Sequence, residues 1–307
     1  MSDATRGSGT SGIRLGANQH GKAEVRLVTV DRPSPGSGTG EHVLHDLNVT
    51  TQLRGDFATA FTAGDNAHVH ATDTQKNVVY AKAHELGVRS PEGFLLALAD
   101  HWQQQPWVEG SILKAEQYSW DRLPANGHSF ARRGQETRVA AVQAYADERL
   151  VLSGLTDLVV LKSTGSEFHG FPRDRYTTLA ETNDRILATS VTAWWRWAER
   201  PEDWDAAYDR VKELLLDAFA RVHSLALQQT IFEMGRAALE AIPEIAEMRI
   251  SCPNKHHFLV DLSPFGQEND NEVFYAADRP YGLIEATICR EGVPDDPRAW
   301  VDIPAFA

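Results

Sequence analysis

One order of predicted elements occurs twice along this sequence, and it limits the possible folds more than any other feature. In each half, strands come first, two helices follow, and strands return. The alternation of apolar and polar residues over 24–30 predicts a half-buried strand, and a second strand at about 42–53 completes a hairpin with it. Further strands are predicted within 111–162 and at about 186–198, 247–262 and 281–290.

The helices are indicated by start signals and by apolar stripes. Thr72-Asp73-Thr74-Gln75 predicts a capping box at the start of one helix. Ser90-Pro91 predicts the start of the next, with serine at the N-cap and proline at the first helical position. In the second half, residues 203–222 carry apolar side chains at three- and four-residue spacing, the clearest helical pattern in the chain. A fourth helix is predicted at 224–241, ahead of Pro243.

These elements predict an α+β protein made of two similar antiparallel-sheet-plus-helices modules, 19–155 and 156–307. No close sequence repeat relates the halves, so this prediction depends on the order of elements alone. Residues 1–18 are rich in Gly, Ser and Thr without apolar periodicity, which predicts a disordered tail. Residues 33–40 consist of Pro, Ser, Gly and Thr, a composition typical of a loop.

The charge balance limits the classes of partner. The chain has 30 Lys and Arg against 43 Asp and Glu, a net charge of -13. Nucleic acids and anionic membranes bind basic surfaces, so neither is expected as a partner. No apolar run is long enough to cross a bilayer, and the N-terminus lacks the apolar segment of a secretory signal. Cys252 and Cys289 are too few for a disulfide scaffold, so we expect a cytoplasmic protein.

Five places concentrate side chains that are suited to chemistry. They are Gly21-Lys22, Thr72-Asp73, Phe168 with Arg185, Gln228, and Asn254-Lys255-His256-His257. Each place also has a structural explanation that requires no activity. Lys22 fits a solvated surface lysine, Thr72 fits a helix cap, and Gln228 fits an exposed helical residue.

The same holds for the other two places. Phe168 fits a core aromatic residue, and Arg185 fits a surface ion pair with Asp184 or Asp174, a common and weak interaction. Asn254 and His256 are two residues apart, so on a strand they would form one polar pair on the same face. None of these places identifies a function by itself.

Seven segments taken together resemble one family. In sequence order they are 20–26, 64–77, 161–168, 174–179, 184–187, 228–230 and 253–256. As a set they resemble the urate oxidase (uricase) family, from about residue 20 to residue 290. The resemblance implies a tunnelling fold, in which the two modules of each chain lie side by side. It also implies a barrel-like homotetramer with active sites at the subunit interfaces.

The resemblance further implies an activity: oxidation of urate by O2 with water to 5-hydroxyisourate and hydrogen peroxide, without a cofactor. In the family, the residues that match Lys22 and Thr72 form the catalytic pair, and the residue that matches His256 joins a proton relay with that lysine. The chemistry is reasonable, because a threonine hydroxyl is a poor base by itself and a nearby amine can take its proton.

The family pattern assigns other residues to urate itself. Arg185 and Gln228 are expected to hold the urate anion, because a guanidinium fork binds a flat anion at two points and an amide complements a ring edge. Phe168 is expected to stack on the urate ring, with Leu227 lining the pocket.

Three more positions complete the predicted site. In the resembled family, the backbone at Thr72 and Asp73 also binds the substrate, and a helix N-terminus offers free N–H groups for this. Asn254 is expected to lie over the substrate where O2 or water binds. His257 is expected to face away from the site, because it alternates with His256 along the predicted strand.

A metal or nucleotide cofactor is not expected. His68-Val69-His70 would place two imidazoles on one strand face, an arrangement found in metal sites. However, the spacing indicates no third ligand, the resembled family uses no metal, and no GxGxxG motif leads from a strand into a helix. Two alternatives stay open: a tunnelling-fold enzyme that hydrolyses a pterin or purine with a bound metal, and a catalytically inactive purine-binding or scaffold protein.

Overall fold

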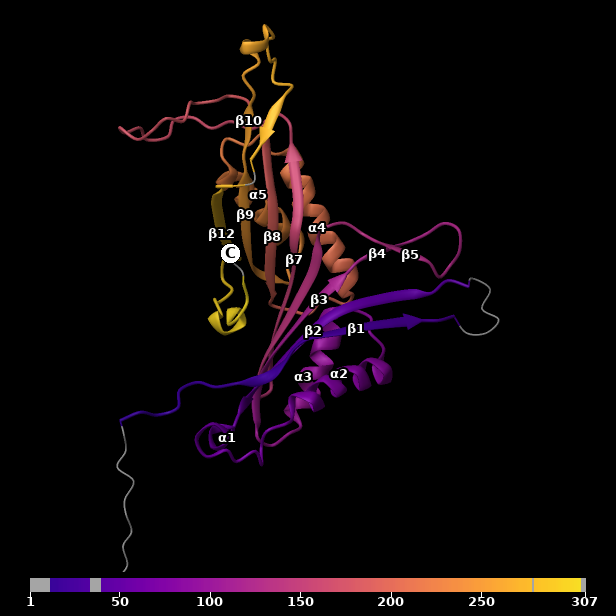
Figure 1. Cartoon of the computed structure of the whole chain (residues 1–307). Helices are drawn as coiled ribbons and strands as arrows, with labels where there is room; N and C mark the ends of the chain where they lie inside the picture. Colours follow the sequence, from indigo (N-terminus) through magenta and orange to yellow (C-terminus); the bar gives the residue numbers. More distant parts are fainter. Residues whose placement is uncertain (1–11, 34–39, 278, 305–307) are drawn as a thin grey trace, which may run out of the picture.

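The computed structural model describes residues 12–33, 40–277 and 279–304. In this part of the chain one antiparallel sheet has eight strands, in the order β1-β2-β3-β6-β7-β8-β9-β12 (Figure 1). Its strands are β1 (His20–Asp31), β2 (Val43–Gly55), β3 (Val108–Tyr118), β6 (Thr137–Tyr145), β7 (Glu148–Lys162), β8 (Leu187–Trp197), β9 (Ile245–Lys255) and β12 (Gly282–Cys289). Two small hairpins pair β4 (Trp120–Arg122) with β5 (Phe130–Arg132) and β10 (His257–Leu259) with β11 (Phe274–Ala276).

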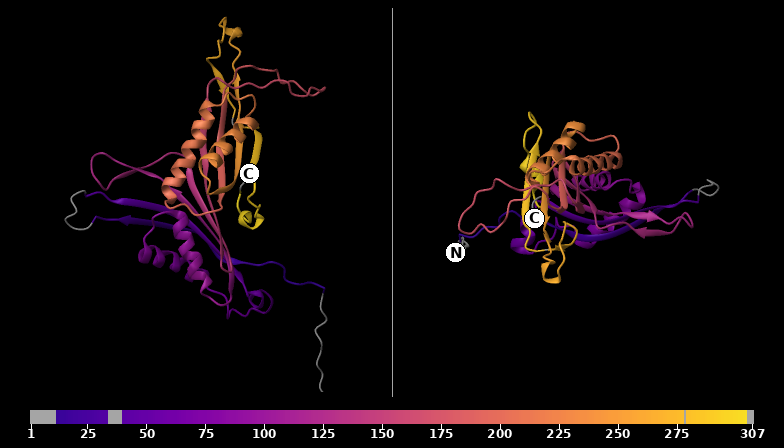
Figure 2. Two further views of the ribbon diagram at one scale, coloured as in Figure 1. Left: turned by 180° about the vertical axis from the view of Figure 1, so that it is seen from behind. Right: turned by 90° about the horizontal axis from the view of Figure 1, so that it is seen from above.

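The long helices of both halves lie on one side of the sheet (Figure 2). The helices are α1 (Ala58–Ala63), α2 (Thr72–Leu86), α3 (Pro91–Gln103), α4 (Trp204–Arg221), α5 (Leu227–Ala241) and the short 3-10 helices η1 (Ser263–Phe265) and η2 (Pro297–Trp300). Helix α2 packs on β1, α3 packs on β3 and β6, and α5 packs on β9 and β12.

The pleat of β6 shows how the two faces of the sheet differ. Ala140 and Val142 belong to the main core under the helices. Val139 and Ala141 point the other way and pack in a smaller core with Trp300 of η2. This alternation is what a strand period of two requires of a strand that is buried on both faces.

Both halves of the sheet repeat the predicted order of elements. The first half runs β1, β2, α2, α3, β3, β6, and the second runs β7, β8, α4, α5, β9, β12. The predicted boundary between residues 155 and 156 falls within β7, next to a register shift between Leu155 and Leu158. The repeated order changes from the first set to the second between β6 and β7.

Two local predictions are confirmed. Ser90 caps α3 by accepting from the Gly93 N–H, and the helical pattern at 203–222 forms α4, for which Asp203 is the N-cap. The predicted helix at 224–241 begins later, at Leu227, because Ser224 instead accepts a backbone hydrogen bond from Glu167 at 2.7 Å. Helix α1 and the hairpin of β10 with β11 were not predicted.

Two predictions fall largely on residues outside this description. For the predicted disordered tail, residues 1–11 lie outside the described residues, and residues 12–19 contain no helix or strand. For the predicted loop at 33–40, residues 34–39 lie outside the described residues. Within the described ranges, no helix is long and apolar enough to span a membrane.

Candidate active site

Arg185 and Phe168 meet at one end of the second half of the sheet. Arg185 lies two residues before β8, and its guanidinium carbon is 5.1 Å from the centre of the Phe168 ring. The Arg185 Nε atom also donates a hydrogen bond of 3.4 Å to the Ser166 hydroxyl. The Phe168 ring and the Ser166 hydroxyl together fix the orientation of the guanidinium.

The structural alternative for Arg185, an ion pair with a neighbouring aspartate, is not formed. Asp184 accepts hydrogen bonds from the Thr164 hydroxyl and the Gly165 N–H. Asp174 accepts from Thr177 in its own turn. In the described part of the chain, therefore, neither predicted aspartate neutralises Arg185.

A cavity of about 150 Å³ opens beside this pair. Its lining residues are Phe168, Leu179, Ala180, Thr182, Arg185, Ile186, Asn254, His256, His257 and Phe258. Four predicted site residues share this cavity, although Phe168 and His256 are 88 positions apart (256 − 168). The fold therefore brings together a cation, an aromatic ring, an amide and an imidazole.

Burial and charge determine the protonation states in this cavity. Partial burial lowers the pKa of the Arg185 guanidinium from its usual value, yet arginine remains cationic in proteins. Burial also lowers the pKa of His256, and the positive charge of Arg185 lowers it further. At neutral pH, His256 is thus a neutral imidazole that is able to accept a proton.

The structure around residues 254–257 differs from the predicted strand. Strand β9 ends at Lys255, and His256 lies in the gap before β10. The strand predicted through His256 was therefore wrong, although Asn254 and His256 do line the same cavity. The prediction that His257 faces away was also wrong, because His257 lines the same cavity.

The connection between β7 and β8 supplies lining residues that the sequence prediction missed. Phe168 and Thr182 exchange backbone hydrogen bonds of 2.8 and 3.0 Å, which closes the intervening segment into a loop. Leu179 and Thr182 then form part of the wall. Such a loop has no hydrophobic periodicity, so the sequence carries no signal for it.

Leu227 and Gln228 are the first two residues of α5 and do not line this cavity. Leu227 is buried and Gln228 is exposed. An isolated parallel bridge joins Ser166 to Ser224, just ahead of α5. The start of α5 therefore lies close to the segment that contains Phe168.

Lys22 belongs to a second group, in the first half of the sheet. It pairs with Thr51 across β1 and β2, and the Thr51 hydroxyl donates a 2.9 Å hydrogen bond to Gln75 of α2. Lys22 is therefore next to the strand position that contacts α2. The Lys76 ammonium is the main cause of the lowered pKa of Asp73, and the charge of Lys22 adds to it. Lys22 thus lies near the N-terminus of α2.

The predicted capping box at this N-terminus was wrong. The N-cap of α2 is Ala71, which makes no side-chain cap, and Thr72 is the first helical residue with an exposed side chain. Gln75 is buried and bonded to Thr51 instead. A cap contributes about 1 kcal/mol, whereas an unsatisfied buried polar group costs about 1–3 kcal/mol, so the buried contact prevails. The Thr72 hydroxyl is left free of a capping role.

The His68-Val69-His70 segment is not a strand, so the predicted HxH face is absent there. His68 stacks on Trp107 with ring centres 5.4 Å apart, and its Nδ1 lies 3.1 Å from Asp56. Among the described residues, one set of three side chains holds possible metal ligands within 4.8 Å of one another: Glu247, Cys289 and Asp295. It contains none of the predicted site residues.

The sheet separates the two groups of predicted residues. Strands β2, β3, β6 and β7 lie between β1 and β8. Five strand spacings of about 4.8 Å place these two strands about 24 Å apart. One chain therefore carries the Lys22 group and the Arg185 group as two separate partial sites.

Known proteins are similar to this chain over most of its length. A family model described as Uricase matches residues 18–143 and 151–285. The chain is 58% identical over 295 residues to the uricase of Arthrobacter globiformis, with 96% of each chain covered. The chain belongs to the uricase family. It is also 36% identical over 281 residues to the uricase of Dictyostelium discoideum, with 89% of this chain and 96% of that one covered.

Solved uricase structures share the fold of this uricase-family chain. The crystal structure of the Arthrobacter globiformis uricase matches it with a TM-score of 0.90 at 58% identity, covering 94% of this chain and 99% of that one. A uricase from Bacillus fastidious matches with a TM-score of 0.77, covering 90% and 94%, and at 23% identity this match shows the fold alone. The predicted α+β tunnelling fold is confirmed.

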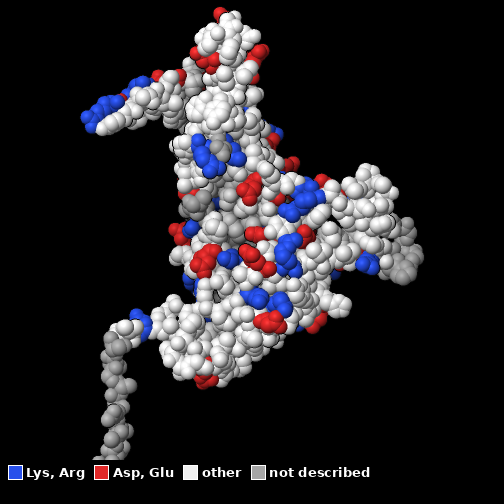
Figure 3. Space-filling model, in the orientation of Figure 1, with Lys and Arg blue, Asp and Glu red and all other residues white. Residues whose placement is uncertain are grey.

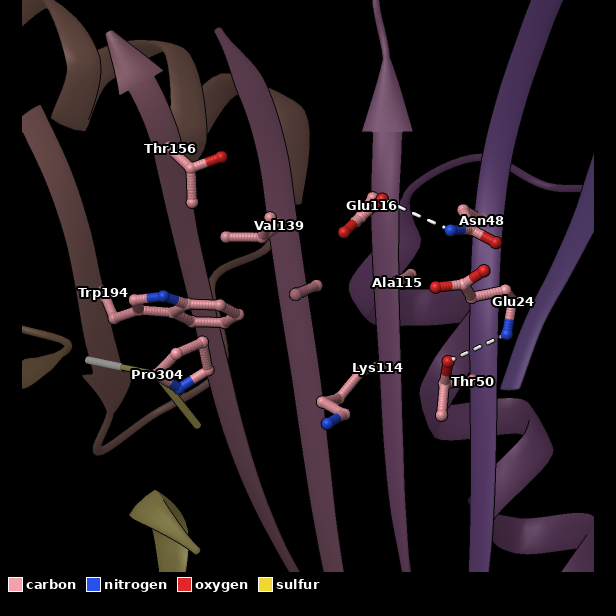
Figure 4. A pocket seen from close by; sticks show the side chains of 11 residues that line it. Glu24, Asn48, Thr50, Lys114, Ala115, Glu116, Val139, Thr156, Trp194 and Pro304 are labelled. Atoms are coloured by element: carbon pink, nitrogen blue, oxygen red, sulfur yellow. Dashed lines mark hydrogen bonds between the residues drawn. The ribbon is translucent and has the colours of Figure 1, made fainter. Parts of the chain in front are cut away.

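The uricase-family chain has a larger cavity, of about 290 Å³, on the sheet face opposite the helices. Figure 4 shows Trp194 and Pro304 on one side of it and Glu24 on the other, with Lys114 between them. Acidic and basic side chains are intermingled over this face (Figure 3). None of the predicted site residues lines this cavity, so cavity volume alone does not locate the site.

Proposed function

We propose that this chain is a cofactor-independent urate oxidase. Urate, O2 and water give 5-hydroxyisourate and hydrogen peroxide; urate loses two electrons and O2 is reduced to peroxide. The observation that carries this proposal, beside the family, is the half-buried Arg185 that lies against Phe168 without an ion pair to Asp184 or Asp174. An arginine that is held in place and not neutralised is suited to binding a small planar anion.

In this proposal Arg185 and Gln228 hold the urate anion, and Phe168 stacks on its ring. Leu227 lines the apolar side of the urate pocket, and Asn254 holds O2 and then water over the urate ring. The shared cavity of Phe168, Arg185 and Asn254 supports these roles. Deprotonated urate is itself an electron-rich reductant, so the protein has only to deprotonate it, orient it and exclude water.

Lys22, Thr72 and His256 move the protons. Lys22 takes the proton of the Thr72 hydroxyl, and the backbone at Thr72 and Asp73 binds the substrate from the α2 side. The free Thr72 hydroxyl and the nearness of Lys22 to the start of α2 support this pairing. His256, which is neutral at pH 7, accepts a proton from the other side of the ring.

We propose that the complete site forms between two subunits of a barrel-like homotetramer. The two partial sites in one chain are separated by four strands, so the Lys22 group of one subunit would meet the Arg185 group of its neighbour. Within each chain we keep the division into two modules, because the element order repeats, with the change from one module to the next between β6 and β7. The net charge of -13 supports the absence of nucleic-acid partners, and the low cysteine count, with only Cys252 and Cys289, supports a cytoplasmic location.

The direct test is a urate assay on protein that has been dialysed against a chelator and scanned for flavin. Urate absorbance should fall while peroxide forms in equal amount. If the protein consumed no urate under these conditions, the proposal would be refuted. Stoichiometric bound zinc would favour a metal-assisted hydrolase, and urate binding without peroxide would favour a non-catalytic purine-binding protein.

The shared site has its own test. Lys22→Met and Arg185→Gln each disable one partial site, so subunits of the two variants are unfolded together and reassembled. If one subunit supplies Lys22 and its neighbour Arg185, random pairing restores about a quarter of the sites to full composition. Reassembled mixtures that are no more active than either variant would contradict a site shared between subunits.

A further inference from the structure

His20 and His70 occupy matching positions relative to the proposed catalytic pair. His20 lies two residues before Lys22 on β1, and His70 lies two residues before Thr72. The β1–β2 ladder is regular from His20 to Lys22, so these two side chains lie on the same face of the strand. His70 acts on the pKa of His20 through both its backbone and its ring, which means that the two histidines are neighbours.

Aromatic rings enclose the two histidines. The His20 ring meets Phe57 edge to face, with centres 4.4 Å apart. The His70 ring lies 5.2 Å from Trp102 and 5.5 Å from Trp107. Strand β1, the segment that leads into α2, and helix α3 are therefore packed together through these rings.

The imidazole nitrogens in this packing make no well-formed hydrogen bond. Both ring nitrogens of His20 and the Nε2 atom of His70 are buried without a partner of hydrogen-bond geometry among the described residues, and the His70 backbone is only a weak polar contact of the His20 ring. A phenylalanine in either place would fill similar space without a buried unsatisfied polar atom. Simple packing therefore does not explain why these rings are histidines.

Burial is the main cause of a lowered pKa at His20, and the charge of the His70 ring acts in the same direction. The His70 backbone opposes them. His20 is therefore neutral at pH 7, and protonating it places a charge in a partly buried aromatic environment.

The surrounding charges do not compensate such a proton. The titratable groups on the elements packed around the pair include Lys22 on β1, Asp56 and His68 in the connection after β2, Asp73, Lys76, Lys82 and Glu85 on α2, and His101 on α3. The acids of the connection, α2 and α3 are already engaged: Asp56 with His68, Asp73 with Lys76, Glu85 with Lys82, Glu92 with Arg138 and Asp100 with Arg149. Burial lowers the pKa of His101 as well, and Lys82 and His70 lower it further.

We propose that His20 and His70 are positioning residues for Lys22 and Thr72. Their rings pack β1 against the segment that leads into α2, and so hold the amine beside the hydroxyl. In acid a proton on the His20 ring is repelled by Lys22 on the same face of β1, and the two segments separate. The catalytic part of this proposal depends on the proposed urate oxidase activity; the packing part does not.

The packing part is tested by melting temperature against pH. His20→Phe keeps the ring contact with Phe57 and removes both unsatisfied nitrogens, so its Tm at pH 8 should equal or exceed that of the wild type. The folded pKa of His20 lies below its unfolded value of 6.5. The contribution of neutral His20 to wild-type stability is thus fully present above pH 6.5 and is lost as the pH falls through the folded pKa. His20→Phe should lose less Tm between pH 8 and pH 5.5.

The control for this comparison is His84→Gln, on the exposed last turn of α2. It removes a histidine from the same helix without touching the pair and should lose Tm as the wild type does. Equal losses of Tm in the wild type and in His20→Phe would overturn the packing part.

The catalytic part is tested by kcat and KM for urate between pH 5.5 and pH 9, in His20→Phe and in His70→Phe. Each variant should keep about threefold more of its pH 8 kcat at pH 5.5 than the wild type does. KM should change less than kcat, because Arg185 and Gln228 in the other partial site still hold urate and only the contacts at Thr72 and Asp73 depend on this packing. Wild-type pH profiles in both variants would overturn the positioning role. A wild type that turns over no urate at any pH would contradict the proposed function instead. The Tm measurements would then still test the packing role of His20 and His70.

Discussion

The Arg185 guanidinium carbon lies 5.1 Å from the centre of the Phe168 ring, at the edge of a cavity that Asn254 and His256 also line. The two residues come from the opposite ends of one loop, which backbone hydrogen bonds between Phe168 and Thr182 close. A cation held over an aromatic ring in this way offers a flat anion a charge at the edge of the cavity, while Phe171 stacks on Phe168 with ring centres 4.9 Å apart.

Replacing Arg185 should weaken substrate binding more than it slows turnover. Arg185→Gln removes the charge and the planar fork, and KM for urate should rise about 10- to 100-fold. Arg175→Gln is the matched control, because Arg175 lies over Tyr176 in the same loop and is exposed. Steady-state kinetics that give both variants the same KM would count against Arg185 as the urate ligand.

The same substitution should change the titration of His256. The positive charge of Arg185 is, after burial, the largest cause of the lowered pKa of His256. Arg185→Gln should therefore raise that pKa part of the way back toward its usual value, and the loss of kcat/KM in acid should begin at a higher pH. NMR titration of the His256 ring measures the shift directly, and an unchanged titration would contradict the electrostatic coupling.

Lys22→Met and Thr72→Ala should each lower kcat about 10²- to 10⁴-fold, the usual contribution of a proton-transfer group. Neither change should unfold the protein, since Lys22 is only half-buried and Thr72 is exposed. Lys82→Met serves as the control, because Lys82 lies on the same helix as Thr72 and pairs with Glu85 instead. Near-normal turnover in either variant, at unchanged Tm, would remove that residue from the catalytic pair.

Gly21→Ala should destabilise the protein severely. A Cβ atom at Gly21 would lie 1.8 Å from the Thr51 carbonyl oxygen and 2.8 Å from the Gln52 Cα, so the β1–β2 ladder would have to shift. The expected loss is about 3 kcal/mol or more of the free energy of unfolding, measured in urea. Gly16→Ala is the control, because nothing lies within 4 Å of its added Cβ; equal unfolding midpoints for the two variants would refute the steric argument.

Elements with a regular spacing of apolar residues were predictable because all those side chains pack into one core. The α4 helix is an example: Tyr208, Val211, Leu215 and Phe219 are buried at the predicted spacing. The capping box at Thr72 failed because the strand residue Thr51, distant in sequence, binds the Gln75 side chain that the cap required. The strand through His256 failed because the chain leaves the sheet after Lys255.

The sequence alone determined the order of elements, the acidic net charge and the resemblance of seven segments to one family, since each of these is a local property of the chain. Only the tertiary structure decided which of the predicted residues share a site. It placed Phe168, Arg185, Asn254 and His256 around one cavity and left Lys22 and Thr72 four intervening strands away. The physical reason is that strand pairing over long sequence separations fixes these distances, and periodicity within a segment carries no information about them.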